Sequence, residues 1–227
     1  MKTAHLHWLL DTAVEYPPPL HYFLPIVRSD HLNVREIPGF QSDDYARLIE
    51  SGLEEGLIQL AHDEETPDLL AARSAVNMQA RGLRPKGEGR FTFRLTPQGG
   101  EAWERMANPL WDRFFYFSCL LPDDELRVSA TLASMNWDAV IAYLGWFDRL
   151  ASIDVNWETL RIETRSNYAA TYWKRVDGMH EATLDGVYHL PERYAPAFAS
   201  AWALSLNKWR IRPWDRPDWA GQGVSSD

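Results

Sequence analysis

Apolar residues recur along the first half of the chain with the periods of short helices and strands. Leu6, Leu9 and Leu10 share one helical face, and the prolines at 17–19 end that helix. Alternation of apolar and polar residues marks the strands. The predicted elements, in order, are a helix at 6–13, a helix at 42–56, a strand at 57–60, a helix at 67–81, a strand at 91–95 and a helix through Trp103 and Met106, whose apolar face continues through Trp111, Phe114, Phe115 and Phe117.

The second half has a different order of elements. The predicted elements are a strand at 125–132, a helix at 136–150, a strand at 159–164, a strand at 182–190 with a turn near Asp185-Gly186, a helix at 192–208 and a short strand at 209–212. This β-α-β-β-α-β order is typical of a ferredoxin-like sandwich. The segment 166–180 has no clear assignment.

Two short stretches of the first half suggest a known fold. Leu53-Glu-Glu-Gly56-Leu57-Ile58 ends the predicted helix at 42–56 and enters a strand. Phe91-Thr-Phe-Arg-Leu-Thr96-Pro-Gln-Gly99 returns as a strand and enters a helix. This order resembles the recognition helix, wing and closing helix of MarR-like winged-helix proteins. The resemblance implies a winged helix whose wing is longer than usual and carries the helix predicted at 67–81.

These patterns predict an α+β protein with two domains. Residues 1–120 form a winged-helix-like domain with a helical insertion in the wing, residues 121–219 form a small α+β domain, and residues 220–227 are a disordered tail. Tryptophan usage supports the division, because one of the 11 tryptophans lies before residue 100. The architecture is similar to that of ligand-sensing transcription factors of the Lrp type, although no residue motif supports that likeness.

Composition narrows the class of protein. With 45% apolar residues among 227, the chain is able to bury a sizeable core. No apolar run approaches the length of a membrane span, and the first ten residues lack the pattern of a secretory leader. A lone cysteine, Cys119, cannot form an internal disulfide. We therefore expect a cytoplasmic protein that does not associate with membranes.

Charge is distributed unevenly over a chain with a net charge of −9. The predicted recognition helix carries five acidic residues against Arg47, which disfavours entry into a DNA groove. The following segment is basic, and its candidate nucleic-acid or partner-binding residues are Arg81, Arg84, Lys86, Arg90 and Arg94. This basic segment either grips a phosphate backbone or is solvated and pairs with the acidic helix beside it.

Motifs for catalysis, cofactors and metals are not found in the sequence. Nucleophile, phosphate-binding and dinucleotide-binding patterns do not occur, and the histidines lack metal-ligand spacing. We therefore assign no catalytic residue, cofactor or metal. Two aromatic clusters beside cations are candidate ligand or partner anchors, with core packing as the alternative. These candidate anchors are Tyr168, Tyr172, Trp173, Trp214 and Trp219.

Two functions fit this pattern. The first is a non-enzymatic protein-interaction or accessory module, whose partner is another protein. The alternative is a DNA-binding transcriptional regulator that reads DNA through the basic segment and senses a ligand in its second half. Neither the oligomeric state nor the identity of a ligand follows from the sequence.

Overall fold

The computed structural model describes residues 3–20, 37, 39–62, 65–80, 91–120, 127–150, 153–188 and 209–210. Helices and antiparallel sheets occur together, so the protein belongs to the α+β class. The chain divides into two compact units. Among the described residues, the first unit contains those up to Asn108 together with Thr171–Trp173, and the second contains the rest.

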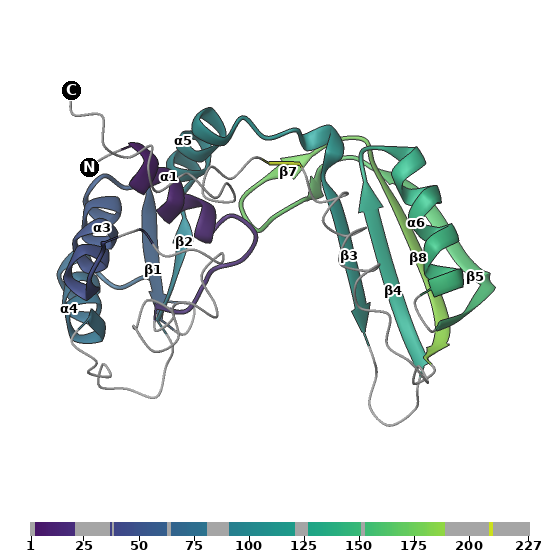
Figure 1. The fold of residues 1–227 in the computed structure, drawn as a ribbon, viewed down its shortest axis with the longest axis horizontal. Helices are drawn as coiled ribbons and strands as arrows, with labels where there is room; N and C mark the ends of the chain where they lie inside the picture. The colour runs from purple at the N-terminus through teal and green to yellow at the C-terminus, as the bar shows by residue number, and fades with distance from the viewer. Residues whose placement is uncertain are drawn as a thin grey trace. The chain divides into compact units, whose positions relative to one another are not determined.

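The first unit follows the order of elements predicted for it (Figure 1). Strands β1 and β2 pair antiparallel, from Ile58 opposite Leu95 to His62 opposite Phe91, and Pro19 forms an isolated bridge to Thr92 of β2. The helix expected between the two strands is present. The helices and strands are α1 (Thr3–Thr12), α3 (Ser42–Glu54), β1 (Ile58–His62), α4 (Leu69–Ala80), β2 (Phe91–Leu95) and α5 (Pro97–Ala107).

Helix α1 lies at the centre of the core of the first unit. Its Trp8, Leu9 and Leu10 have no exposed surface. Trp103 of α5 is equally buried, and its indole N–H donates a hydrogen bond to the Asp11 carboxylate at 3.0 Å. After α3, Gly56 adopts a positive φ of 67°, as expected at a helix end, because a residue without a Cβ adopts this conformation at little cost.

The second unit is built on a sheet with the strand order β3-β4-β8-β5, in which every pair is antiparallel. Two strands precede helix α6, so the element order differs from the predicted β-α-β-β-α-β. The elements are η2 (Trp111–Arg113), β3 (Phe115–Leu120), β4 (Arg127–Ser134), α6 (Trp137–Leu150), β5 (Ile153–Arg165), β6 (Tyr168–Ala169), β7 (Arg175–Val176) and β8 (Met179–Tyr188).

The additional strand, β3, comes from the aromatic run expected to extend a helix. Phe115 and Phe117 instead alternate along the strand and contact Tyr143 of α6, with ring centroids 4.8 and 5.3 Å apart. Because β3 pairs with β4, it belongs to the second unit. The two units therefore divide after Asn108, whereas the sequence placed the boundary at residue 120.

Helix α6 covers one face of this sheet (Figure 1). Alternate residues of the strands point toward it, such as Leu132 of β4 and Leu184 of β8, and these residues form the core with Val140 and Leu144 of α6. The Asn136 side chain caps α6, because its Oδ1 atom accepts hydrogen bonds from the Asp138 and Ala139 N–H groups at 3.0 and 3.4 Å. The opposite face of the sheet carries polar residues such as Ser129 of β4 and Asp185 of β8.

The elements predicted for the last part of the chain have different outcomes. Strand β8 runs without interruption through Asp185 and Gly186, so the predicted turn there is wrong: both residues pair with β4 and lie between strands on either side. Within the unassigned segment 166–180, β6 and β7 form a small ribbon. The predicted helix at 192–208 and the tail at 220–227 lie outside the described residues.

Candidate functional site

The basic segment proposed to contact nucleic acid falls mostly outside the described ranges. Arg81, Arg84, Lys86 and Arg90 belong to this portion. Arg94 lies on β2, is half-buried, and its buried Nε atom makes no hydrogen bond within the described part of the chain. Its guanidinium also lies close enough to Tyr172 to act electrostatically on that phenol. Arg94 is therefore partly packed within the first unit.

Helix α3 presents an acidic outer face. Asp43 of the helix and Glu55, which directly follows it, are exposed, and the Asp44 carboxylate accepts a hydrogen bond from Arg47 at 2.6 Å. The Gln41 N–H, which donates to the same carboxylate at 2.8 Å, and Arg47 together hold the pKa of Asp44 below its ordinary value. The one basic side chain of this helix is thus engaged by an acid of the same helix.

Helix α4, the insertion between β1 and β2, packs against α3 (Figure 1). Ala72, Ala75 and Val76 of α4 are buried. Arg73 forms an ion pair with Glu54 at 2.9 Å and approaches Glu50 at 3.9 Å. Arg73, which precedes the basic segment along the chain, therefore pairs with the acidic helix.

Tyr172 and Trp173, two candidate anchors, lie within the first unit. The Tyr172 hydroxyl accepts a hydrogen bond from the Leu95 N–H at 2.6 Å and donates to the Ala13 carbonyl at 2.7 Å. The Trp173 indole N–H donates to the Val14 carbonyl at 2.9 Å. Its ring packs so closely on Gly100 that a Cβ there would come within 2.3 Å of it. These contacts are structural, because they satisfy the polar atom of each side chain.

The other candidate anchors are not brought together with this pair. Tyr168 lies on β6 in the second unit and is half-buried. Burial and the nearby Glu181 carboxylate raise the pKa of Tyr168 to about 12. Trp214 and Trp219 lie outside the described residues.

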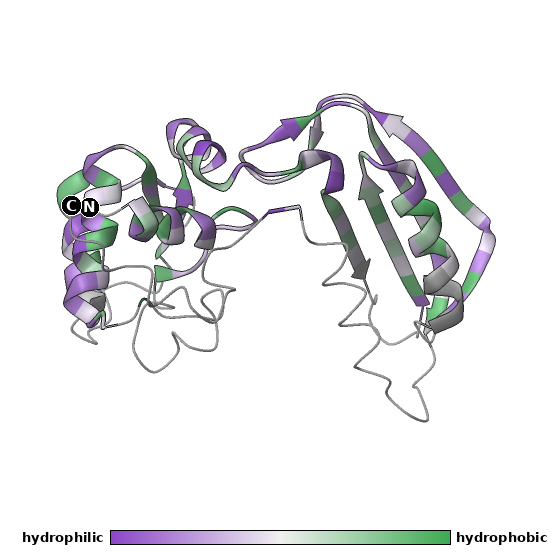
Figure 2. Ribbon diagram, turned by 45° about the horizontal axis from the view of Figure 1, so that its top comes forward, coloured by the Kyte–Doolittle hydropathy of each residue, from purple (hydrophilic) through white to green (hydrophobic). Residues whose placement is uncertain are grey.

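The two edge strands of the sheet in the second unit differ in character. Strand β3 contains no charged residue over Phe115–Leu120, and among the described residues it has a strand neighbour on one side only, β4. Strand β5, at the other edge, carries Asp154, Glu158, Arg161, Glu163 and Arg165. Figure 2 shows the alternation of hydrophilic and hydrophobic residues along β5. Charges on an edge strand oppose pairing with another chain, and β3 lacks them.

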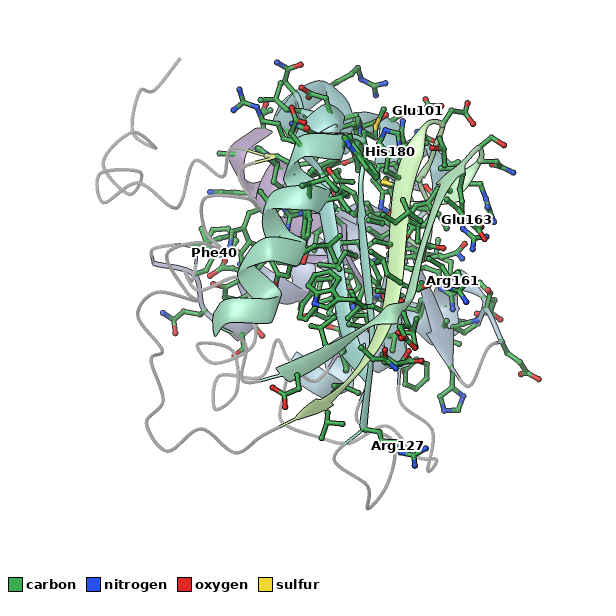
Figure 3. The ribbon with its side chains drawn as sticks, turned by 90° about the vertical axis from the view of Figure 1, so that its right-hand side faces the viewer. Phe40, Glu101, Arg127, Arg161, Glu163 and His180 are labelled. Atoms are coloured by element: carbon green, nitrogen blue, oxygen red, sulfur yellow. The ribbon has the colours of Figure 1, made fainter. Side chains whose placement is uncertain are left out.

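The sheet face away from α6 holds a hollow that the sequence did not indicate. Figure 3 shows Arg161 and Glu163 on this side of the sheet and Arg127 at its end. The hollow has a volume of about 440 Å³ and crosses β4, β8 and β5. Its polar lining residues are Arg127, Ser129, Asp154, Asn156, Thr159 and Asp185. The sequence did not indicate this hollow because a turn was predicted at Asp185-Gly186. A turn there would end β8, the strand that forms the floor of the hollow.

An irregularity in β5 shapes one wall of the hollow. The pairing with β8 shifts register between Asn156 and Arg161. Within this bulge the Thr159 hydroxyl donates to the Asn156 carbonyl at 2.7 Å and accepts from the Asp185 N–H at 2.9 Å. A side chain thus replaces a main-chain partner of β8, which fixes the bulge beside the hollow.

Comparisons with known proteins give no relative. No protein-family model matches the chain, and neither the curated proteins nor the solved structures contain a significant match. Within the described ranges, no three His, Cys, Asp or Glu side chains are grouped to hold a metal ion, and no helix is long and apolar enough to cross a membrane.

Proposed function

We propose that this chain is a non-enzymatic protein-interaction module that associates through strand β3, the uncharged edge of its four-stranded sheet. One observation carries the proposal: β3 has a strand neighbour on one side only among the described residues and has no charged side chain, whereas the opposite edge is charged and bulged. Main-chain N–H and C=O groups along such an edge bind an added strand.

The side chain of Tyr116 on β3 also favours association with an added strand. Tyr116 is 40% exposed and, since Phe115 and Phe117 contact α6, it lies on the open face of the sheet. An added strand would cover its ring. Aromatic rings placed opposite one another across an antiparallel pair contribute roughly 0.2–1 kcal/mol each relative to alanine.

The partner that we assign to this edge is a second copy of the chain. Two β3 strands related by a two-fold axis pair antiparallel, which gives a self-complementary contact and one continuous sheet. The chain has a net charge of −9, so copies repel at most surfaces, and an uncharged strand is where this repulsion is smallest.

The mass of the protein in solution tests this proposal. We expect light scattering after size exclusion to give twice the 26.2 kDa chain mass for the wild type at micromolar concentration. Tyr116→Lys, or Ser118→Lys as a second variant, places a charge on β3 and should weaken the dimer at least tenfold. Trp157→Lys is the matched control, because Trp157 is 46% exposed on β5, and this variant should stay dimeric. A wild-type monomer, or a Tyr116→Lys dimer of unchanged affinity, would refute the proposal.

For the first unit we propose the winged-helix fold. Support comes from the order α1, α3, β1, β2 and α5, with α4 inserted between the two strands, and from the bridge between Pro19 and β2. DNA binding through this unit is the alternative function. The acidic face of α3 disfavours it.

A further inference from the structure

A three-residue segment belongs to the first unit although it is remote from the rest of that unit in the sequence. Thr171–Trp173 belong to the first unit, whereas Ala170 and Lys174 on either side belong to the second. Among the described residues, the first unit otherwise ends at Asn108. The first unit therefore holds Thr171–Trp173 in the way that a protein holds a short bound peptide, through contacts that do not depend on neighbours along the chain.

Main-chain groups of the first unit bind the polar atoms of this segment. The Tyr172 hydroxyl accepts a hydrogen bond from the Leu95 N–H of β2 at 2.6 Å and donates to the Ala13 carbonyl at 2.7 Å. The Trp173 indole N–H donates to the Val14 carbonyl at 2.9 Å. Ala13 and Val14 directly follow α1, and carbonyls at the end of a helix lack partners within it. The end of α1 and strand β2 thus present two acceptors and one donor to the segment.

Helix α5 accommodates the indole ring of Trp173. This ring packs edge-to-face against the ring of Trp103, with centroids 5.9 Å apart, and lies against Gly100. A Cβ at position 100 would come within 2.3 Å of the Trp173 ring, so only glycine leaves room for it. Glycine is less favourable than alanine within a helix. The indole ring therefore explains why this helical position is occupied by glycine.

We infer that the end of α1, strand β2 and the start of α5 form a peptide-binding site that recognises a tyrosine followed directly by a tryptophan. The chain's own Thr171–Trp173 occupies this site as an intramolecular ligand. The partner is a protein segment with the same Tyr-Trp pair. Each of these two side chains joins a large apolar ring to one polar group, which is typical of the residues that dominate binding. The site lies in the first unit and goes beyond the proposed association through β3 of the second unit.

The covalent connection determines which ligand occupies the site. A ligand joined to its site by a short linker acts at an effective concentration of roughly millimolar. A separate peptide at micromolar concentration therefore does not displace Thr171–Trp173 from the wild type. The segment is consequently an autoinhibitory contact, and removing its two aromatic side chains should open the site to a peptide.

Fluorescence anisotropy of a labelled peptide with the full chain tests this inference. The probe peptide covers residues 168–176, Tyr-Ala-Ala-Thr-Tyr-Trp-Lys-Arg-Val. We expect the double variant Tyr172→Ala, Trp173→Ala to bind the probe at least tenfold more tightly than the wild type does. The same peptide carrying Tyr172→Ala and Trp173→Ala keeps its charge, and it should bind the double variant at least tenfold more weakly than the probe does.

Helix α5 offers a matched pair of further variants. Gly100→Ala, added to the double variant, places a methyl group where the indole ring lies and should weaken binding of the probe at least tenfold. Because alanine favours a helix more than glycine does, this loss would not come from a weakened α5. Glu101→Ala, at the next position, is the control, since Glu101 is exposed, and binding should be unchanged.

Four binding results would overturn the inference. The double variant does not bind the probe, the wild type binds it equally tightly, the alanine-substituted peptide binds as tightly as the probe, or Gly100→Ala leaves binding unchanged. Circular dichroism verifies the fold of each variant. If the double variant does not fold, Trp173→Ala alone replaces it with the same expected results, because it keeps both hydrogen bonds of Tyr172. A protein folds without its ligand, so failure of both variants to fold would also overturn the inference.

Discussion

The role inferred for Tyr172 from the sequence differs from its role in the structure. In the sequence it stands beside Trp173 and Lys174, a pattern typical of a binding anchor. In the structure the residue as a whole is 38% exposed, whereas its hydroxyl lies between the Leu95 N–H and the Ala13 carbonyl. Those two partners are far from it along the chain, and nothing in a local pattern of residues indicates such distant hydrogen bonds.

Removing this hydroxyl should destabilise the protein. Tyr172→Phe leaves the Leu95 N–H and the Ala13 carbonyl without their partner, which costs about 1–3 kcal/mol. Urea denaturation at pH 7.5 measures the difference. Tyr168→Phe is the control, since the Tyr168 hydroxyl has no hydrogen-bond partner in the described part of the chain, and we expect a smaller loss from it. An equal loss in the two variants would contradict this account of Tyr172.

The loss of stability in Tyr172→Phe should depend on alkaline pH. Burial raises the pKa of Tyr172 above its ordinary value of 10.0, so the neutral phenol is favoured in the folded state. Its stabilising contribution is therefore fully present below about pH 10 and is lost as the pH rises through the raised pKa. The stability difference between the wild type and Tyr172→Phe should consequently shrink in urea titrations above pH 10.

Among the secondary-structure elements, local sequence patterns predicted the helices. They failed where pairing between strands determines whether a segment is extended. Helices α3, α4, α5 and α6 follow from apolar stripes and from start and stop residues, which act within a few turns. Strand β3 was mistaken for a helix because the aromatic residues 114–117 fit either period, and its pairing with β4 settles the choice. Likewise, Asp185-Gly186 is a common turn sequence, but neighbouring strands on both sides hold it extended.

The acidic face of α3 leads to a prediction about DNA. We expect fluorescence anisotropy with random double-stranded DNA to show no binding even at low salt, because Asp43, Asp44 and Glu55 would face phosphates. Micromolar binding with a steep salt dependence would contradict this expectation. Loss of such binding in the double variant Arg84→Glu, Arg90→Glu would then assign it to the basic segment, and the regulator would replace the interaction module as the function.

For the whole molecule, the sequence indicated two parts of different character, and the structure has two units with another boundary. The division falls after Asn108, since β3 joins the second unit, and Thr171–Trp173 belong to the first unit although their neighbours along the chain do not. Local sequence patterns do not show that a short segment belongs to a different unit from its neighbours along the chain. The hollow was missed for a related reason: its six polar residues come from three strands, and only the register of the sheet brings them together.

The most direct test of association through β3 is hydrogen–deuterium exchange at several protein concentrations. If two copies pair along β3, amide protection of peptides covering Phe115–Leu120 should rise with concentration, because the added strand engages the outer N–H groups. Peptides covering β5 should exchange at the same rate throughout. Protection of β3 that is independent of concentration, or a concentration dependence confined to β5, would contradict the account.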